Sequence, residues 1–192
     1  MNRRKFIYNS SIASLSVLGL NSCNQFFRDV KITILHSNDV HSQIEPFPLN
    51  HNRFPGRGGF ARRANIFNEI RSVNPNTLIF DAGDIFQGTP YFNFFQGELE
   101  LKLMKEMGYN AATIGNHEFD AGLDILKKNI LSTNFQFIIS NYDFVNTELE
   151  GLTTPYKIYK KEGIKIGVFG LGIELKGLVN PDLYKETKYY DP

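Results

Sequence analysis

Residues 110–120 read N-A-A-T-I-G-N-H-E-F-D, a short apolar run that passes directly into a glycine and a group of polar side chains. The first five residues are compact and apolar, which is typical of a buried strand. Gly115 then marks the end of that strand. Asn116, His117 and Asp120 therefore follow a strand end, which is where α/β folds build their ligand sites.

The same arrangement recurs on both sides of this run. Predicted strands at 31–37, 77–80 and 135–140 each end at a polar residue, and predicted helices at 60–73, 98–107 and 123–130 have apolar residues at helical spacing. The residues just beyond the four strand ends are Asp39, Asp84, Asn116 and Asn141. We expect all four to meet at one edge of a sheet.

Strands that alternate with helices predict a layered α/β sandwich. Residues 156–159 and 164–171 read as a hairpin, with Lys161-Glu162-Gly163 between them, and we expect this hairpin to lead back into the sheet.

Asp39 and His41 are two residues apart in the first of these loops. An extended step of two residues points both side chains to the same face, so that a carboxylate and an imidazole can share one cation. The alternative is a turn aspartate beside a surface histidine.

Gly83 and Asp84 end the second strand. Glycine allows the backbone to turn sharply, and the two oxygens of a carboxylate can bridge two cations. Alternatively, Asp84 caps the next helix. Asp81, three residues earlier, either forms a hydrogen bond behind Asp84 or satisfies loop amides.

Asn116 offers an amide oxygen, which is an adequate ligand for ions such as Mn²⁺ or Zn²⁺. His117 points to the other side, where it could contact a phosphate oxygen or protonate a leaving alkoxide. Asp120 could hold that imidazole in its useful tautomer. The alternative is an Asn-His turn followed by an aspartate that caps a helix.

Taken together, N-D-x-H, G-D-x-x-Q-G-T and G-N-H-E-F-D resemble the calcineurin-like metallophosphoesterase superfamily, and in detail its 5′-nucleotidase and UDP-sugar hydrolase branch. The resemblance implies a layered α/β/β/α metallophosphoesterase sandwich, of which residues 24–192 would be the N-terminal portion.

The resemblance also implies roles for the residues. Asp39 and His41 would bind a first metal ion, Asn116 would bind a second, and Asp84 would bridge the two. Both would be divalent ions such as Mn or Zn. His117, paired with Asp120, would stabilise the transferring phosphoryl group and assist the leaving group. The expected activity is hydrolysis of nucleotides or related small-molecule phosphomonoesters by a two-metal-activated hydroxide.

The chain departs from the family pattern after Asp120, where the family has a further histidine and a G-H-x-H segment. Its four histidines are His36, His41, His51 and His117. We therefore expect a fold that is incomplete at the C-terminus and a chain that is inactive alone, unless a separate polypeptide supplies the missing part. The alternative is a non-catalytic exported lipoprotein or phosphate-binding module that retains half of the fold.

Residues 1–23 read as an export signal. Basic Arg3-Arg4-Lys5 precede a short apolar stretch, in a pattern similar to twin-arginine signals. Leu20-Asn21-Ser22-Cys23 resembles a lipobox, although Asn21 departs from the small residues usual there. We expect export to a bacterial periplasm, with membrane attachment only through a lipid on Cys23.

The charge balance argues against nucleic acid as a partner. Of 21 basic residues, three precede Cys23, which leaves 18 against 20 acidic residues, a net charge of −2. Such a chain lacks the basic surface that nucleic-acid binding requires.

Overall fold

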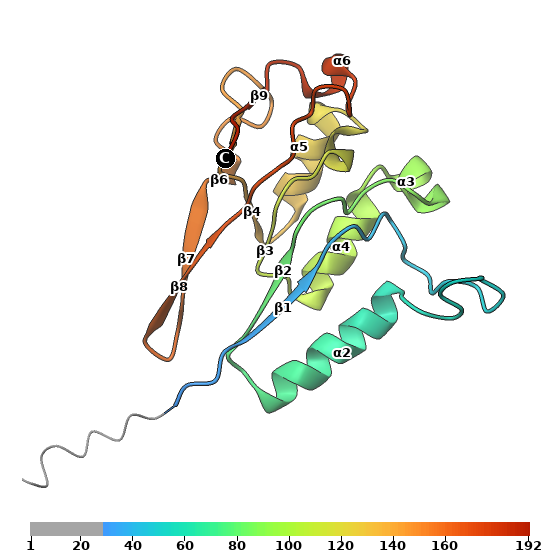
Figure 1. Cartoon of the computed structure of the whole chain (residues 1–192), viewed down its shortest axis with the longest axis vertical. Coiled ribbons are helices and arrows are strands. Elements are labelled where there is room, and N and C mark those ends of the chain that lie inside the picture. Colours follow the sequence, from blue (N-terminus) through green and yellow to red (C-terminus); the bar gives the residue numbers. More distant parts are fainter. Residues whose placement is uncertain (1–28) are drawn as a thin grey trace, which may run out of the picture. The chain divides into compact units, whose positions relative to one another are not determined.

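Five parallel strands form the central sheet of the protein, which a computed structural model describes over residues 29–192. The predicted export signal and lipobox lie outside these described residues. The strands follow one another across the sheet (Figure 1) in the order β1 (Thr33–Ser37), β2 (Thr77–Asp81), β3 (Ala111–Ala112), β4 (Gln136–Ile138) and β6 (Thr153–Thr154).

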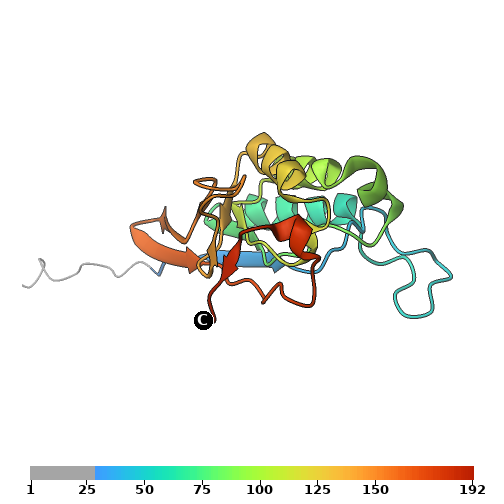
Figure 2. The ribbon, with the colours of Figure 1, turned by 90° about the horizontal axis from the view of Figure 1, so that it is seen from above.

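Helices connect the first four strands and cover one face of the sheet (Figures 1 and 2). Right-handed crossovers between successive neighbours place every connecting helix on the same side. These helices are α2 (Phe60–Val73), the short α3 (Pro90–Phe95), α4 (Glu98–Met107) and α5 (Leu123–Ser132). The predictions for 60–73 and 98–107 are confirmed to the residue, whereas the sequence did not indicate α3.

The hydrophobic core lies between this face and the helices. Ile79 of β2, Leu101 and Met104 of α4, and Leu126 of α5 have no exposed surface, and Phe137 of β4 has 1%. Burying a side chain of this size stabilises a fold by roughly 1.5–3 kcal/mol. The core therefore fixes the strands, and with them the loops that follow the strand ends.

The predicted hairpin is present as β7 (Tyr156–Lys161) and β8 (Ile164–Phe169), but it forms a two-stranded sheet of its own. It lies on the face of the central sheet that the helices leave uncovered. The Tyr159 hydroxyl donates to the carbonyl of Asn110 at 2.9 Å, and its ring lies 5.5 Å from that of Phe80. The prediction that the hairpin rejoins the sheet is thus wrong, because β7 crosses the sheet face and β6 takes the place beside β4.

Four small elements complete the secondary structure of the described residues. A 3₁₀ helix, η2 (His117–Phe119), follows β3, and β5 (Tyr142–Asp143) pairs antiparallel with β9 (Lys188–Tyr189) after the short α6 (Pro181–Tyr184). Within residues 29–192, every helix is too short or too polar to cross a lipid bilayer. The predicted α/β class, with a parallel sheet at its centre, is confirmed.

Candidate metal centre

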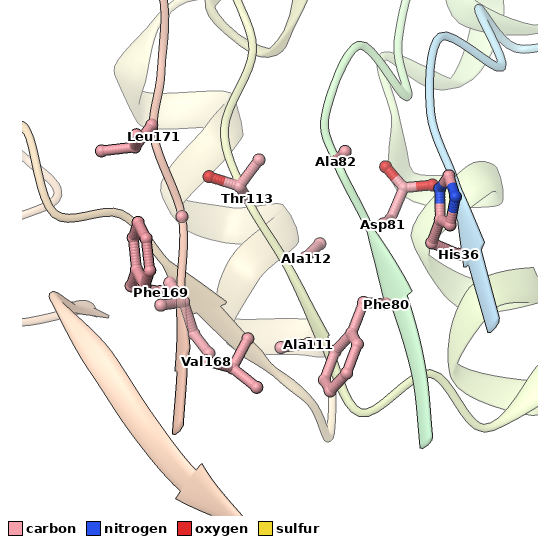
Figure 3. Close-up of a pocket in the computed structure, with 12 residues that line it drawn as sticks. His36, Phe80, Asp81, Ala82, Ala111, Ala112, Thr113, Val168, Phe169 and Leu171 are labelled. Atoms are coloured by element: carbon pink, nitrogen blue, oxygen red, sulfur yellow. The ribbon is translucent and has the colours of Figure 1, made fainter. Parts of the chain in front are cut away.

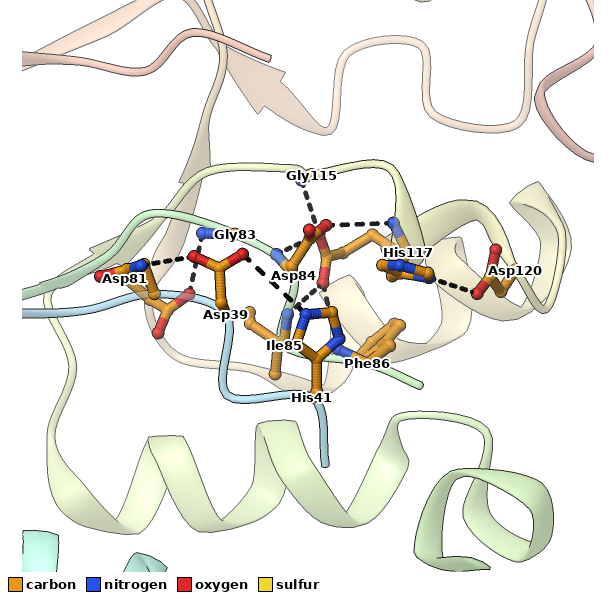
Figure 4. A network of polar contacts seen from close by, with 12 residues as sticks. Asp39, His41, Asp81, Gly83, Asp84, Ile85, Phe86, Gly115, His117 and Asp120 are labelled. Carbon is orange, nitrogen blue, oxygen red and sulfur yellow. Dashed lines mark hydrogen bonds and ion pairs between the residues drawn. The ribbon is translucent and has the colours of Figure 1, made fainter. Parts of the chain in front are cut away.

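The loops that follow β1, β2 and β3 meet at one edge of the sheet (Figure 4). Parallel pairing in register brings this about, since Ser37 lies opposite Asp81 and Asp81 lies opposite Ala112. Backbone hydrogen bonds then tie the first loop to the second, from the Asp39 amide to the Gly83 carbonyl at 3.0 Å and from the His41 amide to the Asp84 carbonyl at 3.1 Å.

These loops contain several residues with unfavourable, left-handed backbone conformations. Of the nine non-glycine residues with positive φ in the described chain, five lie here: Asp39, His41, Ser42, Asp84 and Gln87, with φ between 45° and 67°. Such conformations each cost about 1–3 kcal/mol and cluster at functional sites. The core and the hydrogen bonds between the loops hold these residues in place.

His41, Asp84 and His117 bring their side chains together, so the expectation that His117 points to the other side is wrong. Each offers one nitrogen or oxygen atom, these atoms lie within 4.8 Å of one another, and all three side chains are half-buried. Asp39 approaches the same group, with an oxygen 3.9 Å from His41 Nε2. Imidazole and carboxylate are suitable ligands for Mn²⁺ and Zn²⁺, so these residues fit a divalent ion.

Asp84 points into this group and does not cap a helix. Thr89 is the N-cap residue of α3, whereas an Asp84 oxygen accepts a hydrogen bond from the His117 amide at 3.2 Å. Asn116 lies nearby, and together with Asp39 and Asp84 it lines a hollow of about 180 Å³ at the sheet edge.

His117 and Asp120 form the pair that the sequence suggested. His117 Nδ1 lies 2.7 Å from Asp120 Oδ2, which leaves Nε2 free to face the site. Partial burial lowers the pKa of His117, but the hydrogen bond and charge of Asp120, with Asp84 and Glu118, outweigh it, so the net pKa is raised. Asp120 does not cap α5, whose N-cap residue is Gly122.

Asp81 lies beneath the site and satisfies a loop amide, one of its two expected roles. It accepts hydrogen bonds from the Ser37 hydroxyl at 2.6 Å and from the Gly83 amide at 2.9 Å. Burial raises the pKa of Asp81 to about 6, against the lowering effect of these hydrogen bonds.

Asn141 does not join the metal-ligating group, contrary to the expectation from its place after β4. Its side-chain nitrogen donates to the Gly172 carbonyl at 2.8 Å, and its side-chain oxygen accepts from the Gly172 amide at 2.8 Å. Both polar atoms of the side chain are thus occupied by backbone. Asn141 instead holds the segment Leu171–Ile173, which forms the opposite wall of the hollow.

Glu118 was given no role from the sequence, yet it is fully buried beside the site. It accepts hydrogen bonds from backbone amides of both the second and the third loop. Burial raises the pKa of Glu118 to about 7 despite these bonds. In the sequence, only its position next to His117 points to a role for Glu118. Its hydrogen-bond donors are backbone amides, which become its neighbours only when the chain folds.

A second hollow, of about 250 Å³, lies between the uncovered face of the sheet and the hairpin (Figure 3). Its lining is mainly apolar, including Phe80, Ala111 and Phe169, with Asp81 and His36 at one side. Metal-ligating groups do not converge in it as they do around Asp84, so the loops at the sheet edge remain the candidate centre.

A parallel α/β sheet that gathers carboxylate, imidazole and amide groups at its strand ends has the architecture of a metallophosphoesterase. The family model of the calcineurin-like phosphoesterases matches residues 32–186. The chain belongs to that family, as the motifs suggested.

The curated relatives include several enzymes named 5′-nucleotidase. The chain is 38% identical to a snake venom 5′-nucleotidase from Gloydius brevicauda, over 82% of this chain and 28% of the relative. It is 32% identical to a 5′-nucleotidase from Vibrio parahaemolyticus, over 100% of this chain and 35% of the relative. The chain thus spans about a third of the length of these relatives.

Solved structures agree with the fold. A 5′-nucleotidase precursor from Thermus thermophilus superimposes with a TM-score of 0.71 at 32% identity, covering 84% of this chain and 32% of that one. The Haemophilus influenzae NAD nucleotidase gives a TM-score of 0.69 at 32% identity, covering 84% and 30%. The relatives and solved structures that this chain resembles are thus named as enzymes of the 5′-nucleotidase type, and they do not favour the non-catalytic alternative.

Proposed function

We propose that this protein hydrolyses phosphomonoesters of the nucleotide class in a reaction that depends on divalent metal ions. The observation that carries the proposal is the meeting of His41, Asp84 and His117 within 4.8 Å, beside the hydrogen-bonded pair of His117 and Asp120. Because the chain spans about a third of the relatives it matches, its substrate and activity belong to this proposal.

Four residues would hold two ions of the Mn²⁺ or Zn²⁺ kind: Asp39, His41, Asp84 and Asn116. When bound, such ions supply positive charge opposite phosphoryl oxygens and lower the pKa of water. Asp84, with its two carboxylate oxygens, is the residue suited to bridge them.

His117 would act on the phosphoester itself. With Nδ1 engaged by Asp120, its Nε2 is available to donate a hydrogen bond to a phosphoryl oxygen or a proton to the leaving alkoxide. In the metal-free protein, the hydrogen bond and charge of Asp120 raise the pKa of His117 against the lowering effect of burial, which favours the protonated imidazole. Asp120 would fix the tautomer and the orientation of the ring.

The direct test is hydrolysis of AMP and p-nitrophenyl phosphate by the full chain, with Mn²⁺ or Zn²⁺ and with EDTA. Turnover, by the chain alone or with a separate polypeptide that completes the site, should be abolished by EDTA and reduced at least a hundredfold by Asp84→Ala. Asp124→Ala, which alters an exposed acid of α5, is the control and should keep parental activity. Near-normal turnover of Asp84→Ala, or turnover that EDTA leaves intact, would contradict the proposal.

We also propose that the protein is exported and held at a bacterial membrane by a lipid on Cys23. The basic residues, apolar stretch and lipobox-like end of residues 1–23 support this. Cell fractionation of the parent and of Cys23→Ser tests it. The variant should move from the membrane fraction to the soluble periplasm, and unchanged membrane retention would rule out the anchor.

A further inference from the structure

Glu118 connects the two loops that carry Asp84 and Asn116. One carboxylate oxygen, Oε2, accepts hydrogen bonds from the amides of Asp84 at 3.0 Å and Gly115 at 2.5 Å. The other, Oε1, accepts from the amides of Ile85 at 2.7 Å and Phe86 at 3.3 Å. The side chain has no exposed surface, and among the described residues these four amides are its only hydrogen-bond partners.

The second loop needs such an acceptor because of its backbone shape. Gly83 and Asp84 have φ of 92° and 56°, so the chain turns sharply as β2 ends. The turn directs three successive amides, those of Asp84, Ile85 and Phe86, toward Glu118. Buried amides without an acceptor cost about 1–3 kcal/mol each.

The third loop lies so close to the second loop that a small movement of either one would displace the metal-ligating side chains. A Cβ on Gly115 would lie 2.2 Å from Asp84 Oδ1, and a Cβ on Gly83 would lie 2.7 Å from the Gly115 amide nitrogen. The position of the Asp84 carboxylate is therefore determined by how the two loops are held together. Asn116, the next residue after Gly115, moves with the same loop.

We propose that Glu118 is a positioning residue, which sets the metal affinity of the centre by holding the loops of Asp84 and Asn116 in register without touching the ion. The inference rests on the proposed metal-dependent function. Residues that orient metal ligands from behind commonly change metal affinity by 10–100-fold when replaced.

Glu118→Gln is the most specific single substitution for this test, because it keeps the size of the side chain. An amide has one acceptor oxygen where the carboxylate has two, and its NH₂ group would face backbone N–H groups. Whichever way the amide turns, two backbone amides lose their acceptor. Glu118→Asp keeps the charge but shortens the reach by one methylene, and it serves as a second variant should Glu118→Gln fold poorly.

The experiment measures Mn²⁺ affinity of the full chain by titration calorimetry and the visible spectrum of its Co²⁺ form. Leu126→Ala is the matched control, since it removes a buried side chain of α5 and destabilises the fold from a helix outside these loops. Amide hydrogen exchange of residues 83–86 and 115–116 in the metal-free protein is measured in parallel.

For Glu118→Gln we expect a Kd for Mn²⁺ at least tenfold higher, an altered Co²⁺ spectrum and faster exchange at these amides. Leu126→Ala should lower the melting temperature yet keep the parental Kd and spectrum. Parental affinity and spectrum in Glu118→Gln would overturn the inference and leave the proposed function standing. A parent chain that binds no Mn²⁺ would overturn the proposed function, and unchanged exchange in Glu118→Gln would independently refute the role of Glu118 in holding the loops.

Discussion

His117 Nδ1 lies 2.7 Å from Asp120 Oδ2, so one carboxylate determines which nitrogen of the imidazole faces the site. The two residues are three positions apart, one on η2 and the other directly after it. A single turn of 3₁₀ helix brings residues i and i+3 to the same side. The pairing is therefore local and can be tested without disturbing the rest of the loop.

Asp120→Asn should lower the pKa of His117. The carboxylate stabilises the imidazolium by hydrogen bond and charge, and an amide supplies no charge, so less would remain to oppose the lowering effect of burial. NMR titration of the His117 ring in EDTA measures the change. The exposed-acid variant Asp124→Asn should titrate like the parent, and an unchanged pKa in Asp120→Asn would mean that Asp120 does not act on the ring.

Asp81 should make the fold less stable as pH rises. Its folded-state pKa of about 6 lies above the ordinary 3.8, so between about pH 4 and 6 the folded state binds more protons than the unfolded state. The free energy of unfolding therefore falls as pH rises through this window. A shift of this size corresponds to about 3 kcal/mol at most.

Asp81→Asn tests this dependence, because an amide does not ionise. Urea unfolding of parent and variant is compared at pH 4.5 and 7.5 in EDTA. The variant should gain stability relative to the parent on going from the lower to the higher pH, by up to about 2 kcal/mol, because pH 4.5 already lies above the pKa of the unfolded state. Equal pH dependence of the two proteins would show that Asp81 keeps an ordinary pKa.

The sequence was most informative where a pattern repeats along one element. The helices at 60–73 and 98–107 were predicted with the bounds that the structure shows, because an apolar stripe and an end signal such as Gly108 are local features. Asp39, Asp84 and Asn116 were likewise placed at one sheet edge, since parallel pairing brings successive strand ends together.

The sequence did not predict features that depend on residues far apart in the chain. Asn141 follows a strand as the metal-ligating residues do, but its amide is taken up by Gly172, 31 positions away. The hairpin was found, yet its place depends on Tyr159 contacting Asn110 across the sheet face. Glu118 is an ordinary surface residue by its type, and only the backbone amides around it make burial tolerable.

Gly115→Ala should disturb the centre by steric conflict alone. The new Cβ would lie 2.2 Å from Asp84 Oδ1 and 2.7 Å from the Asp84 amide nitrogen, and the latter cannot swing away as a side chain could. We expect a loss of about 1–3 kcal/mol in the free energy of unfolding, together with weaker Mn²⁺ binding. Calorimetry and urea unfolding measure both.

Gly167→Ala is the matched control, because a Cβ at Gly167 in β8 would meet nothing within 4 Å. It should change stability by about 0.5 kcal/mol or less and leave Mn²⁺ binding as in the parent. If both alanine variants behaved alike, the close approach of Gly115 to Asp84 would not be a constraint on the site.

Asn141→Ala should loosen the segment Leu171–Ile173, which lines the hollow opposite the candidate ligands. It removes both hydrogen bonds to Gly172, and the buried polar atoms left behind cost about 1–3 kcal/mol in the free energy of unfolding. The bond from the Tyr142 hydroxyl to the Ile173 carbonyl, at 2.5 Å, should keep the segment near its place, so that Mn²⁺ binding survives. Amide exchange at Gly172 should accelerate relative to the parent and to Asn134→Ala, an exposed site. A Gly172 amide that stays protected in Asn141→Ala would show that Tyr142 alone suffices to hold this wall.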